Sequence, residues 1–195
     1  MTDREEFLQI FRQQVARPGA DKLLDWLDNK TDFFCAPAST RFHGACEGGL
    51  CMHSLNVYHA LRDRFFGEGD SEESFAICAL LHDLCKANYY KPGTRNVKNE
   101  ATGQWEKVPT YTVEDQFPYG HGEKSVFLIE RFMHLKVEEA VAIRWHMGGF
   151  DDAARGGSFA ISEAYDRYPL AIKLHIADLT ATYLMEHGTS AARRG

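Results

Sequence analysis

Apolar residues recur every three or four positions along most of the chain, which is the period of an amphipathic helix. In residues 3–16, for example, Phe7, Phe11 and Val15 fall on one face, and Pro18 lies just beyond the end of the segment. The pattern therefore predicts a helix there. By the same criteria we predict further helices over residues 21–30, 50–66, 72–86, 122–134, 137–147 and 169–187, the last one stopped by Gly188.

The period changes between the fourth and fifth predicted helices. Residues 88–99 (NYYKPGTRNVKN) and 104–113 (QWEKVPTYTV) are rich in β-branched and aromatic residues, and EATG between them has the composition of a turn. Two glycine-rich segments, residues 31–49 and 148–159, are predicted to be loops. The predicted fold class is therefore all-α, a helical bundle with a two-stranded β-hairpin insertion.

The 195 residues, 44% of them hydrophobic, fit a single domain over 1–195. We expect N-terminal helices in residues 1–36 and a core in residues 37–187. No apolar stretch approaches the roughly 20 residues of a membrane span, and the N-terminus lacks the pattern of a signal peptide. The sequence thus predicts a cytoplasmic protein that does not bind membranes.

The formal net charge of −6 changes the expected partners. Proteins that hold long duplex nucleic acid usually carry a basic stripe, and the sequence shows none. Nucleotides and short single strands need only a few local cations, so they stay open as ligands. The five cysteines are odd in number and lack paired spacing, which is typical of reduced thiols.

Side chains that bind metals fall on the apolar faces of several predicted helices. His82, for example, follows Cys78 by four residues, and Asp178 follows Leu174 by four. Burying such groups is costly unless a partner compensates, and a cation would do so. The full set of candidate ligands is His53, His82, Asp83, His121, His146 and Asp178.

Each of these side chains also has an ordinary explanation. A single histidine on an apolar face is more often a hydrogen-bonded core residue than a ligand, and Asp178 could cap a helix or pair with His175. A set drawn from different helices is better explained together, because imidazoles and carboxylates inside a helical bundle suit divalent metals. We therefore predict a bound divalent metal, with Mn, Fe, Ni, Mg and Zn all open.

The order H…HD…H…H…D, with the HD pair inside LLHDLCK (residues 80–86), resembles the HD superfamily of metal-dependent phosphohydrolases. The segment PASTRFHGACEGGLCMHSLNV (residues 37–57) resembles the segment that precedes the HD pair in bacterial HD proteins, including the HD domain of 3′→5′ exoribonucleases. The resemblance covers about residues 37–185. We expect no OB-type domain like the one those exoribonucleases carry, because the chain leaves no room for it.

The resemblance implies roles for the candidate ligands. It places His53, His82, Asp83 and Asp178 around a first metal. It assigns His121 and His146 to a second metal, with Asp83 as the bridge. Cys85 stands where the family motif has glycine, and we interpret it as a small core residue rather than a ligand.

Other residues are candidates for catalysis and substrate binding. Lys86, one helical turn from the HD pair, is interpreted either as a phosphate contact or as a lysine at a helix C-terminus. His43 is interpreted either as a proton donor or as a surface loop residue. The hairpin could be a lid, a dimer contact or a cover for the core. The cations expected to contact substrate are Lys124, Arg144, Arg155 and Arg95.

These features together predict a metal-dependent phosphohydrolase or phosphodiesterase that uses a metal-activated water on a nucleotide or short oligonucleotide. A di-iron oxygenase with the same ligands and a non-catalytic nucleotide-binding module are the alternatives. The predicted partner is a small phosphorylated substrate or a short nucleic acid, and a homo-oligomer is left open.

Overall fold

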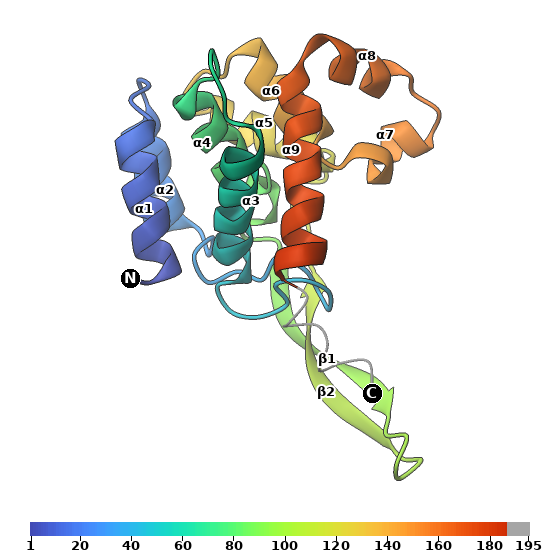
Figure 1. The fold of residues 1–195 in the computed structure, drawn as a ribbon. Coiled ribbons are helices and arrows are strands. Elements are labelled where there is room, and N and C mark those ends of the chain that lie inside the picture. Colours follow the sequence, from blue (N-terminus) through green and yellow to red (C-terminus); the bar gives the residue numbers. More distant parts are fainter. Residues whose placement is uncertain (187–195) are drawn as a thin grey trace.

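The computed structural model describes residues 1–186 and is mainly helical, with one two-stranded antiparallel hairpin (Figure 1). This confirms the predicted combination of helices with a hairpin. The elements are α1 (Asp3–Gln14), α2 (Ala20–Lys30), α3 (Gly49–Phe65), α4 (Glu72–Leu81), β1 (Tyr90–Lys98), β2 (Trp105–Val113), α5 (His121–Glu130), α6 (Val137–Trp145), α7 (Asp152–Arg155), α8 (Ala160–Arg167) and α9 (Pro169–Thr180).

The core joins the N-terminal helices to the rest of the chain in one hydrophobic cluster. α4 is the most enclosed helix, since every residue from Ser74 to Leu81 is buried. α3 packs against α4 and α9, and α6 packs against α5 and α9. Gly19, which has φ 90°, lets the start of α2 lie close to the backbone of Phe132. A Cβ at this position would lie 1.8 Å from the carbonyl oxygen of Phe132.

The predicted end of the fourth helix at residue 86 is wrong. α4 stops at Leu81, and a short 3₁₀ helix, Leu84–Lys86, follows after a turn at Asp83. The amide of Cys85 donates to the hydroxyl of Ser125 on α5 (3.0 Å) instead of continuing the α-helical ladder. The HD pair thus lies where the chain leaves the helix, and α5 holds this departure in place.

The prediction also misses structure near the C-terminus. Residues 148–159, predicted to be a loop, contain the 3₁₀ helix Gly148–Phe150 and α7, and Asp151 caps α7. The helix α8 was not predicted, and it buries only Ala164. α9 continues as a π-helix over Ala181–Met185. The predicted helix end at His187 and its stop at Gly188 lie outside the described residues.

The fifth helix is shorter than predicted. α5 ends at Glu130 rather than at residue 134, because the amides of Phe132 and Met133 both bond to the carbonyl of Ile129. Two amides sharing one carbonyl mark a tightened final turn.

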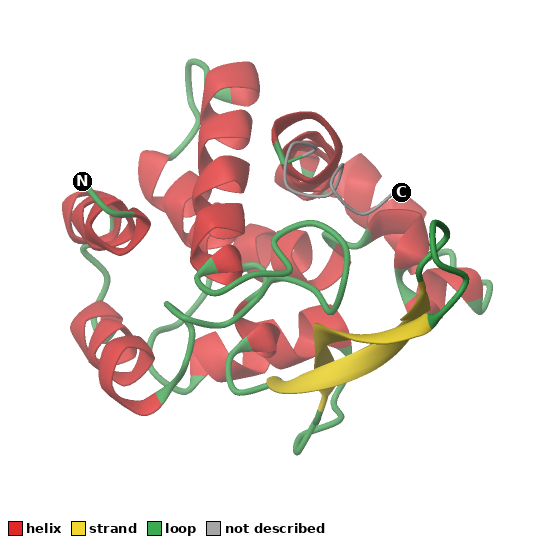
Figure 2. Ribbon diagram, turned by 90° about the horizontal axis from the view of Figure 1, so that it is seen from below, coloured by secondary structure: helices red, strands yellow, loops and turns green. Residues whose placement is uncertain are grey.

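The hairpin projects from the helical body (Figure 1). Its turn lies at the predicted residues, with Lys98 opposite Trp105 at the far end. Side-chain bonds attach its base to the loop before α3, from Tyr90 to the carbonyl of Ala38 (3.4 Å) and from Thr110 to that of Thr40 (3.0 Å). Seen from below, loops cross this end of the bundle and the hairpin extends along one side (Figure 2). Within residues 1–186, no helix is long and apolar enough to cross a membrane.

Candidate metal centre

The carboxylate of Asp83 lies at the centre of the candidate ligands. Its Oδ1 is 2.8 Å from Nε2 of His121 and 3.5 Å from Nε2 of His146. Its Oδ2 is 3.5 Å from Nε2 of His82 and 3.7 Å from Nε2 of His53. Each oxygen therefore faces a different pair of imidazoles, which is the arrangement of a bridging carboxylate.

Asp178 completes the set from α9. Its Oδ1 is 3.2 Å from Nε2 of His53. The candidate ligands form overlapping groups of three, and within each group the ligand atoms lie within 4.8 Å of one another. The groups are His53, His82 and Asp83; His82, His146 and Asp178; and Asp83, His121 and His146. The structure thus brings all the predicted ligands together, in buried clusters that could hold a metal ion.

Backbone carbonyls fix the orientation of two of the rings. Nδ1 of His82 is 2.8 Å from the carbonyl of Ala79, and Nδ1 of His146 is 2.6 Å from that of Ile143. A carbonyl only accepts, so both Nδ1 atoms carry the proton, and in the neutral ring each Nε2 presents a lone pair toward Asp83. Outer hydrogen bonds of this kind orient histidine ligands of metals.

A small residue helps to hold His146 at the end of α6. Gly148 has φ 57°, and a Cβ there would lie 2.3 Å from the ring of His175. The glycine lets His175 pack against this turn and donate from Nδ1 to the carbonyl of His146 (2.6 Å). The Gly148 turn that follows α6 therefore supports the site.

The Nε2 atoms of the histidines around Asp83 show whether a cation fits the centre. Nε2 of His146 is buried and has no hydrogen-bond partner within the described residues. Nε2 of His82 lies 3.3 Å from Nε2 of His53. A buried acceptor without a donor is costly, and a cation among these nitrogens and the Asp83 carboxylate would remove that cost. The donor set therefore fits a divalent metal of the imidazole- and carboxylate-binding kind.

The sequence analysis missed Glu186. This buried carboxylate accepts from Nδ1 of His53 (3.0 Å) and from the side-chain amide of Asn56 (3.0 Å). It directs Nε2 of His53 inward, as the carbonyls do for the other two rings. A weak signal was present, because Glu186 follows Asp178 by eight residues and so falls on the same side of the helix predicted over residues 169–187.

The electrostatics of the histidines differ according to their neighbours. Burial lowers the pKa of His53, but hydrogen bonds with Asp178 and Glu186 outweigh it and raise that pKa to about 10. His82 has no such compensation, and burial lowers its pKa to about 3. Burial also lowers the pKa of His121, but the neighbouring Cys85 and Asp83 outweigh this effect and raise the pKa to about 10.

The carboxylates of the centre are held ionised. Burial raises the pKa of Asp83, but the ammonium of Lys86 and the surrounding imidazoles bring it well below its usual range. The pKa of Asp178 is likewise lowered against burial by its bond with His53. Ionised carboxylates beside a neutral His82 attract a cation.

Both predicted catalytic residues lie at the centre. Nζ of Lys86 is 2.7 Å from Oδ2 of Asp83, and its side chain is 12% exposed. This lysine therefore does more than end a helix, since it neutralises the central carboxylate. The ring of His43 lies 4.9 Å from that of His53, and burial lowers the pKa of His43 to about 4, which favours the neutral imidazole at pH 7.

Two cavities meet at Lys86 and His121. One, of about 410 Å³, has His53, Asp83 and Asp178 at its base, together with His43 and Arg155. The other, of about 490 Å³, extends from the opposite side of His121. Both volumes are in the range of small-molecule sites.

The predicted substrate cations are distributed unevenly. Lys124 and Arg144 line the larger cavity, and Arg155 lines the smaller one. Arg95 lies opposite Val108 in the hairpin and lines neither. The structure therefore brings three of these four cations toward the centre and leaves Arg95 away from it.

The buried Cys85 contacts a candidate ligand. Its Sγ is 3.4 Å from Nδ1 of His121. It is a small buried residue, as interpreted from the sequence, and in addition it packs against the ring of His121, which lines both cavities.

Comparisons with protein-family models, curated proteins and solved structures found no match for this chain. The resemblance of LLHDLCK and GGLCMHSLNV to HD proteins therefore stays a prediction. Inferences about function rest on the geometry of the centre and its cavities.

Proposed function

We propose that the chain is a metal-dependent phosphohydrolase or phosphodiesterase of the HD type, acting on a nucleotide or short oligonucleotide. The observation that carries this proposal is the Asp83 carboxylate, which has imidazole lone pairs against each oxygen and lies at the base of an open cavity. Such a centre suits chemistry in which the ion rather than a side chain activates the nucleophile.

The residues divide into two ligand sets. A first ion would be held by His53, His82, Asp83 and Asp178. A second would be held by His121 and His146, with Asp83 shared between them. When bound, divalent ions lower the pKa of a coordinated water and neutralise charge on a phosphoryl group.

The protein's own groups complete the site. The ammonium of Lys86 faces the same cavity as the ligands and can donate to a phosphate oxygen while it stays paired with Asp83. His43 contacts the cavity from the loop before α3 and can donate or accept one hydrogen bond to the substrate. Both residues position and stabilise the phosphate, so the chain needs few further catalytic side chains.

A screen of the metal-loaded protein tests this proposal. Phosphate mono- and diesters should be hydrolysed anaerobically in the presence of Mn²⁺, and His82→Ala should abolish that turnover. His134→Ala is the matched control, because this histidine is 96% exposed on the side chain. Iron-dependent consumption of O₂ without hydrolysis would instead support the di-iron oxygenase. Nucleotide binding without either reaction would support the binding module.

A further inference from the structure

The cavities on the two sides of His121 differ in chemistry. The apolar chamber is the smaller cavity, with the metal-ligand residues at its base and with walls that include Phe42, Phe150, Leu179 and Tyr183. The polar chamber is the larger cavity, with walls that include Asp115, Glu123, Lys124, Arg144, Asp151 and Asp152. Lys86, His121, Met147 and Phe150 line both chambers, so the candidate metal centre lies where they join.

Aromatic side chains gather at the apolar chamber although they are not part of the core. Phe42 is 62% exposed, Phe150 49% and Tyr183 50%. They come from segments far apart in the sequence, namely the loop before α3, the turn after α6 and the π-helix after α9. Exposed aromatic rings around a concave site favour the stacking of a planar group. A ring held there would extend from a phosphate at the metal centre.

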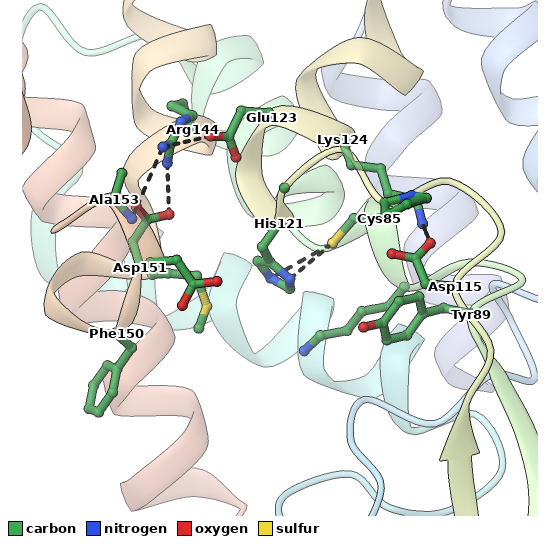
Figure 3. Close-up of a pocket in the computed structure, with 15 residues that line it drawn as sticks. Cys85, Tyr89, Asp115, His121, Glu123, Lys124, Arg144, Phe150, Asp151 and Ala153 are labelled. Carbon is green, nitrogen blue, oxygen red and sulfur yellow. Dashed lines mark hydrogen bonds and ion pairs between the residues drawn. The ribbon is translucent and has the colours of Figure 1, made fainter. Parts of the chain in front are cut away.

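The polar chamber has a different charge balance. The ammonium of Lys124 pairs with Asp115 (2.6 Å). The guanidinium of Arg144 pairs with both Glu123 (2.6 Å) and Asp151 (2.8 Å). Figure 3 shows these two groups on opposite sides of His121. Two of the four cations predicted to contact substrate are therefore already neutralised by carboxylates.

Asp152 adds a further carboxylate to this chamber. Apart from Lys86 and His121, which pair with Asp83 of the centre, the walls hold two cations, Lys124 and Arg144, and four carboxylates, Asp115, Glu123, Asp151 and Asp152. A second phosphate would meet net repulsion there, whereas the hydroxyl groups of a sugar can donate to carboxylate oxygens. The polar chamber thus suits an uncharged, hydroxyl-bearing group.

We propose that the ligand is a short phosphodiester with a single phosphate, whose nucleobase occupies the apolar chamber and whose uncharged sugar side occupies the polar chamber. This inference rests on the proposed function and narrows its substrate class. A dinucleoside monophosphate has the required composition. A nucleoside triphosphate, or a dinucleotide with an additional terminal phosphate, has excess charge for the polar chamber.

Binding and hydrolysis are measured separately on the Mn²⁺-loaded protein. The ligands are a dinucleoside monophosphate, the same molecule with a terminal phosphate, and a nucleoside triphosphate. The dinucleoside monophosphate should bind most tightly and have the highest kcat/KM. Tighter binding of either of the more charged ligands, or no binding of the dinucleoside monophosphate, would overturn the inference.

The two chambers are tested by different substitutions. Phe42→Ala and Tyr183→Ala should each weaken binding of the dinucleoside monophosphate about tenfold or more, because each removes a stacking surface that lines only the apolar chamber. Phe159→Ala is the control, since Phe159 is 84% exposed and lines neither chamber. Unchanged binding in both chamber variants would overturn the assignment of the apolar chamber.

For the polar chamber, Asp152→Asn should improve binding of the phosphate-extended dinucleotide severalfold relative to its parent, and more so at low salt. Asp166→Asn, at an exposed position on α8 outside both chambers, should not change this ratio. An unchanged ratio in Asp152→Asn would count against the charge argument.

The two proposals fail in different ways. If the dinucleoside monophosphate binds with the expected preference and is not hydrolysed, the ligand class stands and the phosphohydrolase proposal fails. If hydrolysis occurs with the opposite preference, the phosphohydrolase proposal stands and the assignment of the chambers fails.

Discussion

Two buried clusters of charged side chains in the described part of the chain differ in whether their donors and acceptors match. In the Arg17 cluster, the guanidinium bonds to both oxygens of Glu139 (2.5 and 2.9 Å) and to Glu73 (2.9 Å). Glu139 also accepts from the hydroxyl of Ser74 (2.7 Å) and the amide of Lys136 (2.7 Å). Donors and acceptors match, so this cluster needs no further ion.

The centre around Asp83 lacks such a match. Nε2 of His146 is buried without a donor among the described residues. Lys86 and His121 each contact one oxygen of Asp83, and neither donates to Nε2 of His146. The difference shows that burial of charge is not by itself the sign of a functional site. The sign is a buried cluster of acceptors with too few donors.

The largest expected effect is loss of the metal. Asp83→Ala should abolish metal binding and turnover together, because the Asp83 carboxylate lies within 3.7 Å of Nε2 of all four imidazoles of the centre. Helical content, measured by circular dichroism, should largely survive. Full metal content in the variant would show that the ions bind elsewhere, and His134→Ala serves as the control.

The Arg17 cluster should behave in the opposite way. Arg17→Met leaves Glu139, which is 0% exposed, without its cation and should lower the free energy of unfolding by about 3–5 kcal/mol. Chemical denaturation measures this change with and without Mn²⁺. The loss should be the same in both, since no metal acts at this cluster, and Arg4→Met at the exposed Asp28 pair should change little. If Mn²⁺ restored the stability of Arg17→Met, the conclusion that this cluster needs no ion would be contradicted.

Lys86 resembles Arg17 in one respect, because its cationic side chain pairs with a buried carboxylate, here that of Asp83. Lys86→Met should reduce turnover about 10²–10³-fold while metal content is kept. The metal-free variant should also be less stable than the metal-free parent, since Asp83 stays buried without its partner. Steady-state kinetics, metal analysis and thermal unfolding measure these effects. Lys22→Met on the exposed face of α2 is the control, and unchanged turnover would assign Lys86 to a structural role.

A smaller effect is expected at Glu186. The Glu186→Gln variant keeps the shape of the side chain but weakens its hold on Nδ1 of His53. Metal affinity should fall about 10–100-fold, as is typical of an outer hydrogen-bond partner of a ligand. Competition with a chelator of known affinity measures the change. An affinity equal to that of the parent would mean that the carbonyl-oriented rings of His82 and His146 suffice.

Local pattern predicted most of the helices and the candidate ligands that the structure brings together, because most of these residues share a face with apolar neighbours. His82 and Asp178 are examples, since the core that buries Cys78 and Leu174 carries them inward. The helix α8 escaped prediction because it buries little beyond Ala164. A periodic signal requires a buried face, and this helix has almost none.

The remaining errors arise from contacts that no local pattern contains. α4 ends early because the amide of Cys85 bonds to Ser125, which lies forty residues further along the chain. Lys124 and Arg144, which were predicted to contact substrate, line the larger cavity, but Asp115, Glu123 and Asp151 neutralise them. Sequence indicates where a cation lies, whereas the fold determines whether its charge is available.

Titration of the metal-free protein with Mn²⁺ or Fe²⁺ tests the central claim most directly. Up to two ions per chain should bind saturably, and His121→Ala and His146→Ala should each lose one ion while they keep the other. Binding should also raise the free energy of unfolding, by about 2.7 kcal/mol at an ion concentration 100 times Kd. A stoichiometry of one in the parent and in both variants would contradict the two-metal centre. Absence of saturable binding would contradict the account as a whole.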